Sequence, residues 1–540
     1  MTGKDTQRNV LFIMCDQLRF DYLSCFGHPH LETPNIDGLA ARGVRFSRAY
    51  VQSPICVPSR MSFYTGRYVH SHGCTWNQIP LRVGEPTLGD HLRPLGVRTA
   101  LAGKTHMSAD LAGMARLGID PASDMGVLIA QCGFEPFERH DGLHPDGRAR
   151  RPAYDTYLRD RGFDAPNPWH EWANAAAGED GEILSGWLME NADKPARIPA
   201  EHSETAYMTG RALDFMEEAG DQNWCLHLSY IKPHWPYIAP APYHALYGAN
   251  QVLPAVRSQA ERDSAHPVFA AFMAEVVSRT MSDDTVRARV VPAYMGLVKE
   301  IDDQLGRLLE FMEERGLMDN TMIVFTSDHG DYLGDHWLGE KELFHEPSVR
   351  FPLIVFDPRA DANATRGTVS DALVEAIDLA PTFIEYFGGT PPGEILEGRA
   401  LTPWLHGKPP GRWRDVVFSE YDYSNRIARK QLDVPVADAR MVMAFDGRWK
   451  YILVEGFPPM LFDLESDPEE LTDLGAAPEH EAERDRLREA IFAWLRRHHS
   501  RITISDEEIE RRYGTELPDG IVIGYWDQDQ VDRDLNRERE

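Results

Sequence analysis

Acidic and imidazole side chains follow two apolar runs that are far apart in the sequence. The run from Val10 to Met14 leads into Asp16. The run from Met322 to Thr326 leads into Asp328 and His329. Short apolar runs are typical of strands buried on both faces of a parallel sheet, where functional groups lie just beyond the carboxyl ends of the strands. We therefore expect these side chains at one edge of a sheet, although Asp16 could instead cap a helix.

Two carboxylates and an imidazole at one sheet edge could bind a divalent metal ion. Carboxylate oxygens favour Ca²⁺, Mg²⁺ or Mn²⁺, and the imidazole of His329 shifts the preference towards Mn²⁺. Gln17 follows Asp16 and adds an amide oxygen. The predicted ligands of the single metal ion are therefore Asp16, Gln17, Asp328 and His329.

A third reactive group is the cysteine in the segment Ser53-Pro-Ile-Cys56-Val-Pro58-Ser-Arg60. Pro58 suits the first turn of a helix, where its missing N–H costs no hydrogen bond. A helix that begins here would direct free N–H groups and the positive end of its dipole towards an anion. The simpler interpretation is a buried cysteine that precedes a helix.

The sequence Cys56-x-Pro58-Ser-Arg60 resembles the signature of the sulfatases. In that family the cysteine is oxidised after synthesis to formylglycine, an aldehyde whose hydrate supplies an oxygen nucleophile. The resemblance implies that a formylglycine-generating enzyme recognises Pro58 and Arg60, and that the converted Cys56 also binds the metal. Further stretches resemble the same family: Thr33 to Phe46, Gly103-Lys104-Thr105-His106, Ser327 to Lys341, and Leu461 to Glu470.

The resemblance also implies roles for individual side chains. Lys104 and His106 would face the anion beside the nucleophile, although a lysine and a histidine on a loop are usually only solvated. His234, on a loop stiffened by prolines, and Lys341 would protonate or stabilise the leaving oxygen. His106 would then remove the remaining proton of the hydrate and regenerate the aldehyde. Arg60 counts among the catalytic residues that the resemblance assigns.

Two branches of the alkaline phosphatase superfamily fit this pattern. Two candidates for substrate binding, Gln17 and Asn77, are residues that resemble those of the phosphonate monoester hydrolases at these positions. Lys104 and His106 instead match the residues that sulfatases carry. We therefore predict an arylsulfatase that acts on sulfate monoesters and, promiscuously, on phosphonate monoesters and phosphodiesters. The alternative is a phosphonate monoester hydrolase with sulfatase side activity. A more remote alternative is an anion-binding protein with unmodified Cys56.

Composition limits the partners of this chain. Its 540 residues include 56 Lys and Arg against 85 Asp and Glu, a formal net charge of −29. This balance argues against nucleic acid, because phosphate binding needs a basic surface. A small anionic ester can still bind in a locally cationic pocket, and the simplest reason for the excess of acidic residues is that net charge keeps a protein soluble.

We see neither a signal peptide nor a membrane-spanning run, and the six cysteines lack CxxC spacing, so we expect a cytoplasmic protein with reduced thiols.

The expected fold is α/β and alkaline phosphatase-like, with a mixed, mostly parallel central sheet flanked by helices over residues 1–410. Residues from about 140 to 200 show no periodicity and predict an irregular insertion that covers the site or forms a surface loop. Residues 411–540 predict a smaller antiparallel sheet of half-exposed strands, at 449–453 and 460–463, with a helix from about 481 to 498. The apolar tail after Asp519 is expected to dock on a neighbour, and the phosphonate-hydrolase resemblance implies a homotetramer.

Overall fold

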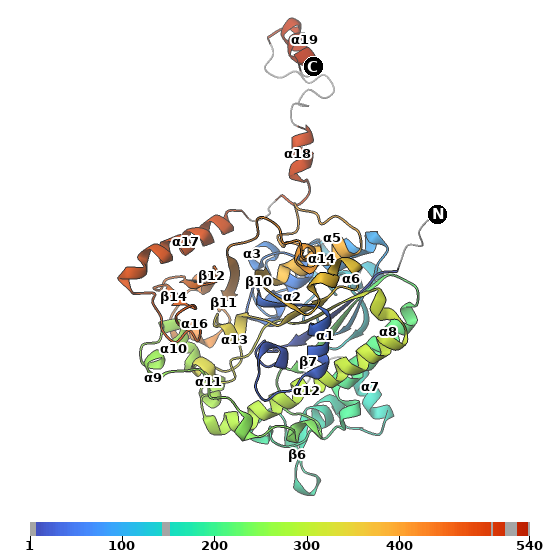
Figure 1. Ribbon diagram of the computed structural model, residues 1–540, viewed down its shortest axis with the longest axis vertical. Coiled ribbons are helices and arrows are strands. Elements are labelled where there is room, and N and C mark those ends of the chain that lie inside the picture. The colour runs from blue at the N-terminus through green and yellow to red at the C-terminus, as the bar shows by residue number, and fades with distance from the viewer. Residues whose placement is uncertain (1–6, 143–151, 498–500, 513–525, 538–540) are drawn as a thin grey trace.

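The computed structural model describes residues 7–142, 152–497, 501–512 and 526–537. An eight-stranded sheet with the order β10-β2-β9-β8-β1-β7-β3-β4 forms its centre (Figure 1). Among these strands β9 alone runs antiparallel to its neighbours, so the predicted mixed, mostly parallel sheet is confirmed. The strands are β1 (Asn9–Asp16), β2 (Val44–Tyr50), β3 (Arg98–Gly103), β4 (Glu135–Arg139), β7 (Trp224–Pro233), β8 (Thr321–Ser327), β9 (Leu353–Phe356) and β10 (Thr368–Glu375).

The first strand shows why the apolar runs form this sheet. Every residue of β1 is buried, and alternate residues belong to two hydrophobic clusters on opposite faces. Phe12 packs against Phe63 and Phe383 on one face, whereas Ile13 joins the cluster on the other. A sheet covered on both faces needs apolar residues at every position, not at every second one. The covering helices are α2 (Cys56–Thr65) and α14 (Leu379–Tyr386) on the first face, and α1 (Pro34–Arg42), α8 (Glu204–Ala219) and α12 (Asp284–Glu314) on the second.

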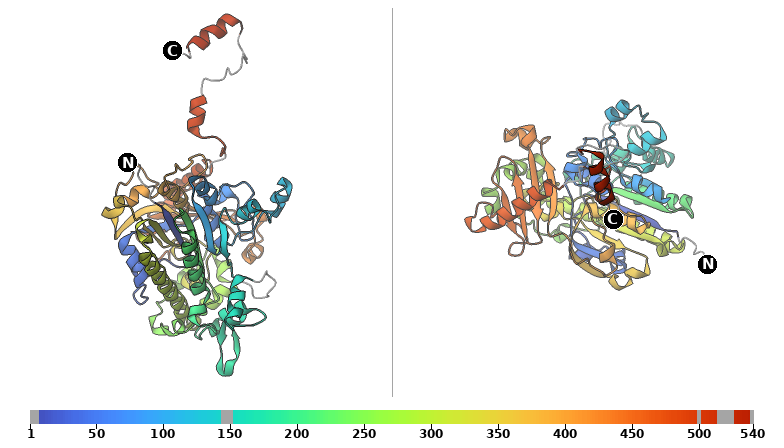
Figure 2. Two further views of the ribbon diagram at one scale, coloured as in Figure 1. Left: turned by 90° about the vertical axis from the view of Figure 1, so that its right-hand side faces the viewer. Right: turned by 90° about the horizontal axis from the view of Figure 1, so that it is seen from above.

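A four-stranded antiparallel sheet lies beside the central sheet, as the right-hand view of Figure 2 shows in orange and red. It contains β11 (Val417–Asp422), β12 (Arg440–Phe445), β13 (Trp449–Val454) and β14 (Met460–Asp463), with α17 (Glu481–Leu495) on one face. The prediction that its strands are half-exposed is wrong, because β13 and β14 are almost wholly buried. Tyr451 and Leu461 face α17, whereas Ile452 and Phe462 pack into the hydrophobic cluster on the first face of the central sheet.

The predicted insertion and tail are only partly described. Residues 152–200 contain α7 (Ala153–Asp160), a π-helix at Trp169–Ala173, and a hairpin of β5 (Ala175–Ala177) and β6 (Ile183–Ser185) that protrudes at the bottom of Figure 1. Residues 143–151 and the apolar tail residues 520–525 lie outside the described residues. The domain boundary near 410 and the homotetramer stay predictions. Among the described residues, no helix combines the length and apolarity needed to cross a membrane.

A buried lysine joins the two sheets. Lys450 of β13 is fully buried, and its Nζ lies 2.9 Å from Oε1 of Glu346 and 2.5 Å from Oε1 of Glu470. It also donates to the carbonyl of Phe344 at 2.9 Å. Glu346 begins the short helix α13 (Glu346–Val349), and Tyr50 of β2 donates to its other oxygen at 3.1 Å. One charge thus connects the C-terminal sheet to the central sheet.

We predict that Lys450→Met lowers the midpoint of thermal unfolding. Removal of one member of a buried ion pair costs about 3–5 kcal/mol, because the remaining charges stay buried without a partner. Differential scanning calorimetry of the variant against wild type measures the shift. Lys408→Met, at an exposed lysine, is the matched control and should leave the midpoint unchanged. Equal midpoints for all three proteins would show that the buried lysine does not hold the sheets together.

Candidate active site

Four neighbouring parallel strands deliver polar side chains to one edge of the central sheet. In the order β8-β1-β7-β3, these strands lead into Asp328, Asp16, His234 and Lys104. Asp16 is paired with Pro233 across the sheet, and Gly103 with Ser229, so the strands end at the same level. The prediction that the two apolar runs bring their acidic residues together is therefore confirmed.

Gly103 shows why the lysine is preceded by glycine. Its backbone has φ 119°, and a Cβ there would lie 2.0 Å from the carbonyl oxygen of Ser229. A larger residue could neither adopt this conformation readily nor fit against β7. The close approach places Lys104 in the buried centre of the site, where its Nζ lies 2.5 Å from Oδ2 of Asp16.

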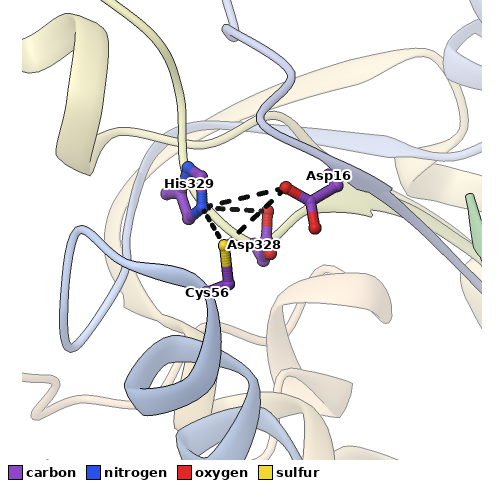
Figure 3. A group of neighbouring side chains, drawn as sticks. All are labelled: Asp16, Cys56, Asp328 and His329. Carbon is purple, nitrogen blue, oxygen red and sulfur yellow. Dashed lines mark hydrogen bonds and ion pairs between the residues drawn. The ribbon is translucent and has the colours of Figure 1, made fainter. Parts of the chain in front are cut away.

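The cysteine comes from the first turn of α2, which points at the sheet edge (Figure 3). Cys56 is buried, and its Sγ lies 3.2 Å from Nε2 of His329 and 3.9 Å from Oδ1 of Asp16. Ser59 of the same turn donates to the carbonyl of Asp328 at 2.5 Å. The amide N–H of Val57 donates to Oδ1 of Asn77 at 3.0 Å, so the predicted substrate-binding residue Asn77 also caps this helix.

Arg60 connects the two carboxylates. This fully buried guanidinium lies 3.0 Å from Oδ2 of Asp16 and 2.8 Å from Oδ2 of Asp328. It also donates to the carbonyl of Lys104 at 2.9 Å and to the hydroxyl of Ser229 at 2.8 Å. All of these contacts lie within the protein, so Arg60 positions the acidic groups and does not face a substrate. Arg60, predicted among the catalytic residues, therefore acts by positioning the two carboxylates.

A compact donor group fits a metal ion. One ligand atom from each of Asp16, Cys56, Asp328 and His329 lies within 4.8 Å of the others, and all four residues are buried (Figure 3). Burial, followed by repulsion from Asp16, raises the pKa of Asp328. Two adjacent buried carboxylates favour a bound cation, which supports the predicted oxygen-rich site.

Gln17, the fifth predicted ligand, has its side chain engaged elsewhere. Its Oε1 accepts from Nζ of Lys341 at 2.7 Å, and its Nε2 donates to Oδ2 of Asp331 at 2.5 Å. Its backbone has φ 65°, a strained value for a side-chain-bearing residue. Gln17 thus positions Lys341, and its role as a ligand stays a prediction.

Cationic groups surround the thiol. Nζ of Lys341 lies 3.3 Å from Nε2 of His234, which itself lies 3.9 Å from Oδ1 of Asp16. Burial alone raises the pKa of the Cys56 thiol, but Lys341, Lys104 and His329 outweigh burial and hold the pKa well below its ordinary value. Burial and then Lys341 lower the pKa of His234 to about 4. The site therefore stabilises negative charge at the position of Cys56.

His106 is held by its backbone. Its amide N–H and that of Thr105 both donate to Oδ1 of Asp141 at 3.0 Å, and its φ is 58°. Its half-buried side chain is one of the neighbours that lower the pKa of the Cys56 thiol. His106 is therefore close to the thiol, and its role as a base stays a prediction.

Sequence reasoning missed several supporting residues: Tyr237, Asp331, Ser229 and Asp141. Tyr237 donates to Oδ2 of Asp331 at 2.7 Å, the same oxygen that accepts from Gln17. Asp331 follows His329 by two positions, and this proximity was a signal that the carboxylate belongs to the site. Tyr237, Ser229 and Asp141 carried no comparable signal, because a hydroxyl or a loop carboxylate is common in any chain.

Comparisons with known proteins agree with this geometry. The family described as Sulfatase matches residues 8–389, and the family described as N-sulphoglucosamine sulphohydrolase, C-terminal, matches residues 334–496. The multifunctional alkaline phosphatase superfamily protein PehA of Trinickia caryophylli is 31% identical over 525 residues, covering 92% of this chain and 96% of that protein. An arylsulfatase of Clostridium perfringens is 26% identical over 503 residues, covering 90% and 94%.

Two solved structures are similar over nearly their whole length. The phosphonate monoester hydrolase of Silicibacter pomeroyi has a TM-score of 0.81 at 28% identity, covering 93% of this chain and 98% of that one. The phosphonate monoester hydrolase of Agrobacterium radiobacter has a TM-score of 0.79 at 28% identity, covering 91% and 96%. The fold, the buried donor group and these matches confirm the resemblance seen in the sequence. The chain belongs to the sulfatase family of the alkaline phosphatase superfamily.

Proposed function

We propose that this protein is a phosphonate monoester hydrolase and phosphodiesterase that also hydrolyses sulfate monoesters, through a formylglycine made from Cys56. The observation that carries the proposal is the buried group of Cys56, Asp16, Asp328 and His329 among cationic side chains. The similar proteins favour this order of activities over a dedicated arylsulfatase. The two phosphonate monoester hydrolases are 28% identical and PehA 31%, against 26% for the arylsulfatase.

The charge of the site supports a shared substrate class. Phosphonate monoesters, phosphodiesters and sulfate monoesters are all monoanions, so one set of cationic groups can accept each of them. Lys104 is paired with Asp16, whereas Lys341 contacts the neutral side chains of Gln17 and His234. Lys341 is therefore the cation best placed to balance charge on the transferred group or the leaving oxygen.

The residues of this chain account for binding and proton movement. A divalent ion held by Asp16, Asp328 and His329 would lower the pKa of a hydroxyl group and polarise a substrate oxygen. The Sγ of Cys56 marks the position that an oxygen of the converted side chain takes. The pair of His234 and Lys341 holds a proton on one side of that position and can donate it to the leaving oxygen. His106 lies near the same position and can accept the proton of the hydroxyl that remains after the transfer. The carbon–oxygen bond to the transferred group then breaks, which releases the phosphonate, phosphate or sulfate and restores the aldehyde.

We expect Cys56→Ala to lose turnover by about 10⁴-fold or more, the scale seen when a nucleophile is removed. The measurement is kcat/KM with 4-nitrophenyl phenylphosphonate and 4-nitrophenyl sulfate, whose common leaving group isolates the effect of the transferred group. Cys25→Ala, at a half-buried cysteine outside the donor group, is the control and should keep wild-type activity. Mass analysis of the tryptic peptide 49–60 should show an aldehyde in place of the thiol. Full activity of Cys56→Ala would rule the mechanism out, and an intact thiol with no turnover would favour the anion-binding alternative.

Chelation of the metal ion should abolish activity and lower the midpoint of thermal unfolding. The physical reason is that Asp16 and Asp328 are adjacent and buried, and lose the cation that offsets their repulsion. Dialysis against EDTA, followed by addition of Mn²⁺, Ca²⁺ or Mg²⁺ in turn, tests both effects and ranks the metals. Unchanged activity and stability in metal-free protein would contradict a metal site.

The preference among substrates should depend on Lys104 and His106. We expect Lys104→Tyr combined with His106→Thr to lower kcat/KM for 4-nitrophenyl sulfate about tenfold more than for 4-nitrophenyl phenylphosphonate, the scale of one charge-assisted hydrogen bond. Metal content and thermal unfolding serve as controls, because Lys104 also pairs with Asp16. Equal losses for the two substrates would show that this pair does not set the preference.

A further inference from the structure

A small cavity of about 220 Å³ lies beside the pair of His234 and Lys341. Trp235, directly after His234, and Glu340, directly before Lys341, both line it. The other main walls are Trp187, Met189, Tyr237 and Val277. Ligand cavities for drug-sized molecules usually measure about 300–1,000 Å³, so this one suits a single small group.

Hydrogen bonds and ring contacts connect the cavity to the catalytic pair. The rings of Trp235 and His234 have their centroids 4.3 Å apart. Tyr237 donates to Asp331, which accepts from Gln17, whose Oε1 in turn accepts from Nζ of Lys341. A leaving oxygen at His234 and Lys341 therefore places the alcohol portion of a substrate within reach of the cavity.

Aromatic rings form much of the wall. The indoles of Trp187 and Trp235 have centroids 5.4 Å apart and planes at 61°, so they form two walls of a corner. The hydroxyl of Tyr237 is bonded to Asp331, which leaves the ring of Tyr237 as the part available to the cavity. Aromatic faces carry partial negative charge and attract cations, and quaternary ammonium groups are recognised by such walls.

Glu340 adds a full negative charge to this wall. The residue is half-buried, and among the described residues no side chain forms an ion pair or hydrogen bond with its carboxylate. Its backbone has φ 61°, a strained conformation of the kind that gathers at functional sites. Burial raises the pKa of the Glu340 carboxyl, and Lys341 and then Arg426 oppose the rise. A carboxylate without a partner in a largely apolar cavity is costly, and a bound cation would offset that cost.

We propose that this cavity binds a quaternary ammonium group on the alcohol portion of the substrate. The substrate class is then a zwitterionic ester, in which a monoanionic phosphonate, phosphodiester or sulfate is joined to a small cationic alcohol. The inference rests on the proposed function, because that function places the leaving oxygen at His234 and Lys341. The net charge of −29 fits the same class, since a zwitterion is not repelled by an acidic protein as a simple anion is.

The test compares two alcohols of the same shape, choline and 3,3-dimethylbutanol, which differ by a charged nitrogen in place of a carbon. Their sulfate and phenylphosphonate esters are assayed with wild type and with Glu340→Gln. We expect Glu340→Gln to lower kcat/KM for the choline esters about 10- to 30-fold, and to change that for the neutral esters less than twofold. Comparison of variant with wild type on each ester cancels the different acidities of the two alcohols.

Two further variants separate the cavity from general effects. Glu190→Gln removes an exposed carboxylate near the cavity that does not line it, so it controls for net charge and should change neither ester. Trp187→Leu removes an aromatic wall and should weaken turnover of the choline esters more than that of the neutral esters. Equal effects of Glu340→Gln and of Trp187→Leu on both kinds of ester would overturn the inference.

Binding of the free alcohols tests the cavity without catalysis. Isothermal titration calorimetry of wild-type protein should detect choline and show at least tenfold weaker binding of 3,3-dimethylbutanol. Glu340→Gln should remove the difference. Activity on the 4-nitrophenyl esters without preference for choline would defeat this inference alone. If the protein binds choline but hydrolyses none of the esters, the inferred ammonium site would be supported and the proposed function contradicted.

Discussion

The structure of this site depends on the repulsion between two buried carboxylates. The parallel strands β1 and β8 end side by side, so Asp16 and Asp328 are brought together away from water. Such a pair is tolerated only if cationic groups and hydrogen bonds compensate it. Arg60 does so by reaching both carboxylates from α2, and Lys104 does so for Asp16 from β3. Each contact that lowers the repulsion also fixes an element of the site in place.

The same compensation positions the cysteine. Ser59 and Arg60 belong to the first turns of α2 and bind the backbone or side chain of Asp328. Because Cys56 lies on that same turn, its distance from His329 and Asp16 is set by the charges that the helix neutralises. A loss of Arg60 would therefore disturb both the acidic pair and the nucleophile. The proposed metal ion would add a further positive charge to this group and strengthen the same constraint.

The sequence predicted the sheet and its acidic edge because burial on both faces leaves an unbroken apolar run, as in β1. It failed where a polar residue is buried with a partner distant in the sequence. Lys450 interrupts the apolar pattern of β13 and suggested a half-exposed strand, yet Glu346 and Glu470 neutralise it inside the protein. The metal-ligand role of Gln17 stays a prediction, but its contact with Lys341 was not foreseen, because that residue is 324 positions away in the sequence. The pattern of residues in one sequence does not indicate which distant residues pair in the folded protein.

The site has two halves with different origins. The acidic half and its cations come from strand ends and α2, whose geometry the central sheet imposes. The cavity beside His234 and Lys341 is lined instead by segments outside the central sheet, including Trp187 and Met189 from the irregular region before α8 and Val277 from a short helix (Val276–Met281). Segments outside the sheet can change without disturbing it, so the proposed alcohol-binding cavity could vary while the groups that face the transferred group stay fixed. Formal charge does not distinguish the monoanionic esters, so under the proposal that this cavity binds a cationic alcohol, the alcohol portion becomes a second basis for substrate choice.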